Sequence, residues 1–167
     1  MASIQVFEAT PDDALALAEV ELAASTCDPV GEIMFGPVDP ESLQHRANDM
    51  RFAMTKDPAS RLFKALIVEP GREPVVAGAS HWFVRDADWM ETRNPELKGT
   101  LCDVDAPKDW GPTANAGACN AFFGFLHDMR KRRMGGKKHA GMSALFLLIC
   151  LYIYFFVDYN CWILISP

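Results

Sequence analysis

The chain has 167 residues, a length that suits one globular domain better than two. Half of the residues are hydrophobic, 23% are charged and the net charge is −6, which excludes collagen-like, disordered and disulfide-scaffold proteins. Residues 1–129 carry 10 Lys and Arg against 21 Asp and Glu, whereas residues 130–139 carry six basic residues and no acidic one. Because an acidic body repels a phosphate backbone, we expect no nucleic-acid partner and favour cationic partners.

The first 56 residues predict a short strand and two helices. A strand is expected at 4–7, and the Thr-Pro-Asp-Asp sequence at 10–13 provides a cap, a first-turn proline and first-turn acids for a helix that ends before residue 28. Its expected buried stripe is Ala14, Leu15, Ala18 and Leu22. Asp-Pro at 39–40 begins a second helix that ends near residue 56. Its expected apolar face is Leu43, Ala47, Met50 and Met54.

The next part of the chain predicts a β-hairpin, a long excursion and a third helix. Apolar runs at 62–68 and 75–84 are separated by a turn that contains Gly and Pro. Residues 86–113 are acidic and interrupted by prolines, which is typical of a long functional loop. Asn115 caps a helix that ends at Gly135, with Cys119, Phe122, Leu126 and Met129 along one side. This alternation of elements predicts an α/β (α+β) layered fold.

The acidic excursion holds the candidate substrate residues. Trp89 and Trp110 stand beside Asp88 and Asp109, and aromatic faces with nearby carboxylates attract an ammonium group. The competing interpretation is a solvated acidic loop with two half-buried tryptophans. The four histidines are isolated and have no metal-ligand spacing, so no metal site is predicted. No Gly-x-Ser-x-Gly sequence occurs, and Cys119 lies on a buried stripe, so we predict a packed thiol and no nucleophile.

Several strings in the first 139 residues point to a known family. They are FAMTKDP at 52–58, LFKA at 62–65, VAGASHW at 76–82, FFGFL at 122–126 and MGGKKH at 134–139. Together they resemble the N-terminal part of GCN5-related N-acetyltransferases of the type common in filamentous fungi, over roughly residues 3–140. The resemblance implies an acyl-CoA N-acyltransferase-like layered fold and acetyl transfer from acetyl-CoA to a primary amine. The neutral amine would attack directly while a base or water removes its proton.

The resemblance ends before the cofactor-binding half of that family. It implies that the next segment is a strand of the central sheet, followed by an Arg/Gln-x-x-Gly-x-Gly/Ala loop that holds the acetyl-CoA pyrophosphate. No such loop follows His139, and Gly135 and Gly136 precede the expected strand. We therefore expect an incomplete, inactive domain over residues 1–139, with no residue assigned to acetyl-CoA or to catalysis. A soluble small-molecule-binding domain is a further alternative.

Residues 140–167 differ in character from the rest of the chain. Residues 140–157 contain no charged side chain. As a helix, 141–158 would be about 27 Å long, close to the roughly 30 Å hydrocarbon thickness of a bilayer. Because a basic segment precedes this helix, we expect it to be a C-terminal membrane anchor. The acidic body would then be cytoplasmic and would bind a partner without catalysis. The soluble alternative is a buried strand followed by a second strand at 161–165.

A third interpretation of the tail concerns the gene. Gly-Met-Ser at 141–143 can be encoded with GTATGT, a common fungal splice-donor sequence, at the point where the resemblance ends. A translated AT-rich intron would be rich in Phe, Leu, Ile and Tyr, as residues 145–165 are.

At the other end of the chain, the first ten residues have no signal-peptide pattern, and no Cys-x-x-Cys pair occurs. We therefore expect a reduced, cytoplasmic body.

Overall fold

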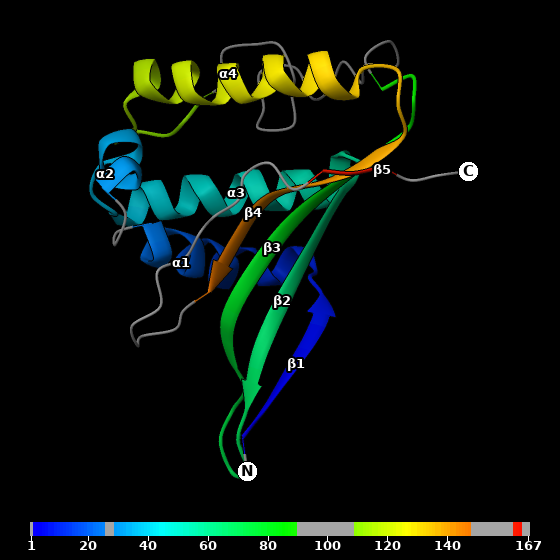
Figure 1. Cartoon of the computed structure of the whole chain (residues 1–167). Coiled ribbons are helices and arrows are strands. Elements are labelled where there is room, and N and C mark those ends of the chain that lie inside the picture. The colour runs from blue at the N-terminus through cyan, green and yellow to red at the C-terminus, as the bar shows by residue number, and fades with distance from the viewer. Residues whose placement is uncertain (1, 26–28, 90–108, 148–161, 165–167) are drawn as a thin grey trace.

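The computed structural model describes residues 2–25, 29–89, 109–147 and 162–164, which form a mixed α/β fold (Figure 1). Five strands form one antiparallel sheet in the order β1-β2-β3-β4-β5. The strands are β1 (Ser3–Glu8), β2 (Ser60–Val68), β3 (Val75–Arg85), β4 (His139–Leu147) and β5 (Trp162–Leu164). The helices are the 3₁₀ helix η1 (Pro11–Asp13), α1 (Ala14–Ser25), α2 (Pro29–Phe35), α3 (Pro40–Lys56) and α4 (Ala116–Met134).

Local signals in the sequence predict most of these elements correctly. The strand at 4–7, the hairpin and the helices that begin near residues 11, 40 and 116 are all confirmed. The Asp39 carboxylate accepts a hydrogen bond from the Ser42 N–H at 2.7 Å, and Asn115 Oδ1 accepts one from the Ala118 N–H at 3.1 Å. Both contacts satisfy amides that a helix leaves without an intrahelical partner. Helix α2 was not predicted.

The predicted buried stripe of α1 is wrong at one position. Leu15 is 43% exposed, whereas Leu17 is fully buried. Ala14, Leu17 and Ala18 follow the i, i+3, i+4 spacing of one helix face, and Leu15 lies outside that face. Helix α1 packs against both α3 and the sheet, so its buried face is defined by these two neighbours.

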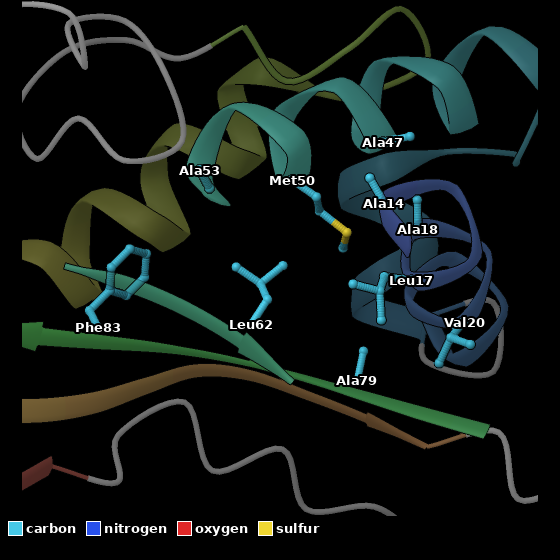
Figure 2. Packing of buried hydrophobic residues seen from close by; sticks show 10 residues of the cluster. All are labelled: Ala14, Leu17, Ala18, Val20, Ala47, Met50, Ala53, Leu62, Ala79 and Phe83. Atoms are coloured by element: carbon cyan, nitrogen blue, oxygen red, sulfur yellow. The ribbon is translucent and has the colours of Figure 1, made fainter. Parts of the chain in front are cut away.

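The hydrophobic core lies between the sheet and the layer formed by α1 and α3 (Figure 2). Its members are Ala14, Leu17, Ala18, Val20, Ala47, Met50, Ala53, Leu62, Ala79 and Phe83. Five of these ten residues are alanines, which allow α1 and α3 to lie close to each other and to the strands. Because Leu62, Ala79 and Phe83 belong to this cluster, their side of β2 and β3 is the helix-covered face of the sheet.

Helix α4 is attached to the body through α2. The Asn115 N–H donates to the Met34 carbonyl at 2.8 Å, and the Thr113 hydroxyl donates to the Phe35 carbonyl at 2.8 Å. Gly36, with φ +66°, lies so close to this connection that a Cβ atom would be 2.6 Å from the Thr113 carbonyl oxygen. A side chain at position 36 would therefore push the start of α4 away from α2.

The expected membrane helix over 141–158 is wrong in its first part, because residues 141–147 belong to strand β4. An uncharged, largely apolar run can form a strand as well as a helix, and the edge of β3 offers backbone partners to β4. The two-strand alternative agrees with β4 and with β5, which lies inside 161–165. Residues 148–158 lie outside the described residues. Among the described residues, no helix has the length and apolar character needed to cross a bilayer.

Candidate functional site

Charged and aromatic side chains meet where β3, β4, α3 and α4 converge. We call this group the arginine–tryptophan cluster; its members are Asp57, Arg85, Trp89, Arg130 and His139. Arg85 ends β3 and pairs in register with His139, the first residue of β4. Asp57 caps the C-terminus of α3, and Arg130 lies in the last turns of α4. The cluster therefore joins four elements that are distant in the sequence.

The Trp89 indole is the centre of the cluster. The Arg130 guanidinium carbon lies 5.1 Å from the ring centroid, and the Arg85 guanidinium carbon lies 5.9 Å from it. The His139 ring meets the indole edge to face at 5.6 Å. These distances are within the range of cation–π and aromatic attraction. The aromatic face that could attract an ammonium ligand is thus adjacent to two guanidinium groups of the same chain.

Asp57 is the carboxylate of the cluster. Its Oδ2 atom lies 3.5 Å from Arg85 Nη2, and its Oδ1 atom accepts a hydrogen bond from the Ala59 N–H at 2.9 Å. The Asp57 side chain is 2% exposed and the Arg85 side chain is 11% exposed. Because burial strengthens such a contact and also makes either charge costly alone, this pair fixes the end of α3 against β3.

Burial changes the protonation of two other members of the cluster. Desolvation, and then the nearby Arg85 charge, lower the pKa of Arg130 to about 9, against a smaller opposing effect of Asp57. Desolvation also lowers the pKa of His139; a hydrogen bond to the Lys137 carbonyl opposes this, and the charges of Arg130 and Arg85 add to it. His139 Nδ1 donates that bond at 2.8 Å. We therefore expect a charged Arg130 and a neutral His139 at neutral pH.

The chemistry available to the cluster is limited by its burial. Guanidinium groups suit carboxylate or phosphate, but Arg130 is 9% exposed and His139 is fully buried. The described contacts fix α4 to β3 and β4, and none of the five residues is placed as a general base for an exposed substrate. The sequence did not indicate this cluster, because Arg85 and Arg130 are brought together only by the sheet register and by α4.

A buried serine–histidine pair lies farther along the same sheet face. Ser60 Oγ and His81 Nε2 are 2.6 Å apart, and the His81 ring packs 4.4 Å from the ring of Phe83. A hydroxyl and an imidazole at this distance are the groups of a nucleophile and its base. Ser60 is 5% and His81 8% exposed, so we interpret the pair as a buried polar contact between β2 and β3. The sequence signal that could have indicated this pair is the β2–β3 hairpin, because its antiparallel register brings Ser60 and His81 close together.

The four predicted substrate residues do not meet in one site. The indole N–H of Trp89 points to the Met134 carbonyl at 3.5 Å, whereas that of Trp110 donates to Asn120 Oδ1 at 2.7 Å. Asn120 and Met134 are separated along α4 by about 21 Å at 1.5 Å per residue. The two indoles thus contact opposite ends of α4 and do not form one cage.

The carboxylates of the predicted site are exposed, and Asp109 contacts α3. Asp88 is exposed. The Asp109 side chain is 81% exposed and lies 3.3 Å from His45 Nε2, while His45 Nδ1 lies 3.6 Å from Asp49. Burial raises the pKa of Asp49, the charges of Arg46 and His45 oppose this, and Asp109 adds to the rise. These contacts connect α3 to the segment before α4.

Metal and thiol chemistry find little support among the described residues. No group of three or more His, Cys, Asp and Glu side chains in that part of the chain is arranged to hold a metal ion. Cys119 is fully buried and its thiol donates to the Met34 carbonyl at 3.3 Å, as expected for a packed cysteine. Burial raises the pKa of this thiol, which lowers its reactivity.

Comparison of the chain with protein-family models, with curated proteins and with solved structures gives no match. The structure defines a mixed α/β protein with one antiparallel sheet.

Proposed function

We propose that this chain corresponds to the N-terminal part of a GCN5-related N-acetyltransferase-like domain, the part that precedes the acetyl-CoA loop. The observation that carries the proposal is the start of strand β4. The sequence resemblance implies a central-sheet strand directly after residue 139, and β4 begins there, with His139 and Ala140 pairing with Arg85 and Val84 of β3. A β-hairpin precedes α4, and the helices between β1 and β2 pack on one sheet face, which agrees with the layered fold that the resemblance implies.

The resemblance to this family also supports the proposal that the chain is inactive. Acetyl-CoA binding in this family depends on backbone amides of an Arg/Gln-x-x-Gly-x-Gly/Ala loop after the central strand. The 167 residues contain no Gly-x-Gly sequence. Gly135 caps the C-terminus of α4, with its N–H donating to the Lys131 carbonyl, so the glycine pair serves the helix end upstream of β4. We therefore propose that the chain does not bind acetyl-CoA.

Any amine acceptor would be attracted by the acidic body. Residues 1–129 have a net charge of −11, from 10 basic and 21 acidic residues, and this favours a cationic amine. Asp88 and Asp109 are both exposed to such a ligand, but they do not share a site with both tryptophans. For the amine acceptor, the proposal is therefore limited to electrostatic attraction by the acidic body, without a defined binding pocket.

Binding of labelled acetyl-CoA to the purified full chain tests the proposal. Equilibrium dialysis is expected to give no saturable binding, and incubation with a diamine is expected to give no labelled product. An acetyltransferase that contains the loop, measured in parallel, shows that both assays detect the reaction. Saturable binding to this chain, or transfer to the amine, would contradict the proposal.

The tail-anchored alternative has weaker support. Residues 141–147 belong to strand β4 and therefore do not form the first part of the expected helix. Residues 148–158 lie outside the described residues. Carbonate-resistant association of the full chain with membranes, together with no acetyl-CoA binding, is the result that would favour the anchor.

A further inference from the structure

Strand β1 leaves one side of the sheet open. It is the first strand in the sheet order and pairs only with β2 among the described strands. All six of its residues are exposed, and Ile4, Val6 and Phe7 are 74%, 66% and 46% exposed. Figure 1 shows β1 at the margin of the sheet, with its N-terminal end away from the helices. Helices α1 and α3 pack mainly over β2, β3 and β4, so β1 lies at the margin of the helix layer.

The sequence of β1 has one feature that discourages strand pairing, a charged residue at its end. Natural edge strands are protected by Pro, by charges such as Lys, by bulges or by short length. Residues 3–8 contain no Pro, Gly, Lys or Arg, and the pairing of β1 with β2 continues without a register shift over all six residues. The one charge is Glu8, at the end of the strand, and Arg61 lies 4.0 Å from it.

The two faces of β1 limit the pairings it can make with itself. Phe7 is opposite Lys64 on β2, two residues from the core residue Leu62, so residues 3, 5 and 7 are on the helix-covered face. Ile4 and Val6 are on the opposite face. If a two-fold axis normal to the sheet relates two copies, their β1 strands are antiparallel, and residues directly opposite each other have their side chains on the same face. Odd-numbered residues of β1 lie on one face and even-numbered residues on the other. An odd-numbered residue can therefore lie opposite only an odd-numbered one, and an even-numbered residue opposite only an even-numbered one.

One such register suits this sequence better than its neighbours. If Gln5 lies opposite Gln5 of a second copy, Ile4 lies opposite Val6 and the glutamine side chains can bond to each other. All of residues 3–7 are then paired, and Glu8 stays beyond the paired region. A shift that centres the axis on Val6 would place each Glu8 opposite Ile4. A shift that centres it on Ile4 would leave Val6 opposite Ala2, outside the strand.

We propose that two copies of this chain associate through β1, edge to edge, in a continuous antiparallel sheet with Gln5 opposite Gln5 of the second copy. The second copy is favoured over an unrelated peptide because the apolar pair, the amide pair and the charge position are all self-complementary in one register. This inference does not depend on the proposed enzyme family.

Oligomeric state measurements test the edge pairing. Sedimentation equilibrium of the full chain is expected to show a dimer fraction that rises with concentration. Val6→Lys places a charge against Ile4 of the second copy and should weaken the dimer about tenfold or more. The matched control is Val84→Lys, because Val84 is 42% exposed on β3 and outside the proposed interface; its dimerisation should be unchanged.

Disulfide trapping tests the register. Directly opposite residues have Cα atoms about 4.5–5.5 Å apart, which a disulfide can bridge, whereas diagonal neighbours are about 7–8 Å apart. Gln5→Cys should give an intermolecular disulfide between the two introduced thiols, identified by peptide mapping, and Val6→Cys should give little. A monomer at every concentration, a dimer that survives Val6→Lys, or preferential trapping through Val6→Cys would overturn the proposal.

Discussion

The guanidinium carbon of Arg130 lies 5.1 Å from the centroid of the Trp89 ring. The two residues come from α4 and from the turn after β3, so this contact fixes the C-terminal end of α4 to the sheet. The N-terminal end of α4 is fixed separately, where Trp110 stacks on Phe123 at 4.8 Å. One helix is thus anchored by two tryptophans in two different environments.

Replacing Trp89 should cost more stability than replacing Trp110. Trp89 is 5% exposed, so Trp89→Leu removes buried ring contacts with Arg130, Arg85 and His139 and should lower the free energy of unfolding by about 3 kcal/mol. Trp110→Leu, at a half-buried position, should lower it by about 1 kcal/mol. Urea unfolding of the two variants measures the difference. Equal losses would contradict a central role for the Trp89 ring.

The stability of the fold should decrease as the pH falls below about 6.5, the ordinary pKa of histidine. The pKa of His139 is lowered in the folded chain, first by burial and further by Arg130 and Arg85. Between the lowered and the ordinary pKa, the unfolded chain therefore binds more protons than the folded chain. His139→Gln should flatten this dependence. Unfolding free energies at pH 8, 6.5 and 5 test it, and parallel curves for the two proteins would refute the assignment.

The Glu21–Arg46 pair should be sensitive to the loss of either partner. Arg46 Nε and Nη2 contact the two carboxylate oxygens of Glu21 at 2.6 and 2.8 Å, and this pair joins α1 to α3. Arg46→Met should destabilise the chain by about 2–4 kcal/mol, because it leaves a largely buried carboxylate without its guanidinium partner. The Glu21→Met, Arg46→Met double variant should lose less than the sum of the single losses. Strict additivity in a double-mutant cycle would contradict this coupling.

Removal of the cap of α4 offers a local test of the fold. Asn115→Ala removes the acceptor for the Ala118 N–H and should lower the free energy of unfolding by about 1 kcal/mol. Asn115→Asp keeps an acceptor at the same place and should retain most of the stability. If both variants are equally destabilised in urea, the hydrogen bond is not the origin of the loss.

The elements that the sequence predicted are those with local causes. Asp39 and Asn115 cap their helices through residues three positions later, and a single sequence contains that information. The arginine–tryptophan cluster has no local signal, because Arg85 meets His139 only through the β3–β4 register. Asp88 next to Trp89 suggested a cationic ligand, but the cations that reach the indole come from Arg85 and Arg130 of the same chain.

The C-terminal helix was predicted wrongly over residues 141–147 for a physical reason. A largely apolar run has no clear period of polar positions. The sequence alone therefore cannot distinguish a helix, which satisfies its own backbone hydrogen bonds, from a strand, which bonds to the backbone of a neighbouring strand. Here β3 offers such an edge, and Gly141 and Met142 pair with Phe83 and Trp82. The neighbouring strand, which is far away in sequence, decides the conformation.

The sequence of the mature transcript across the codons for residues 136–167 tests the central claim most directly. If the chain is the N-terminal part of an acetyltransferase-like domain, the transcript is expected to splice after codon 140 or within codon 141. It should then continue in frame into an Arg/Gln-x-x-Gly-x-Gly/Ala loop. A mature transcript that retains the codons for 141–167 and then ends would contradict the account.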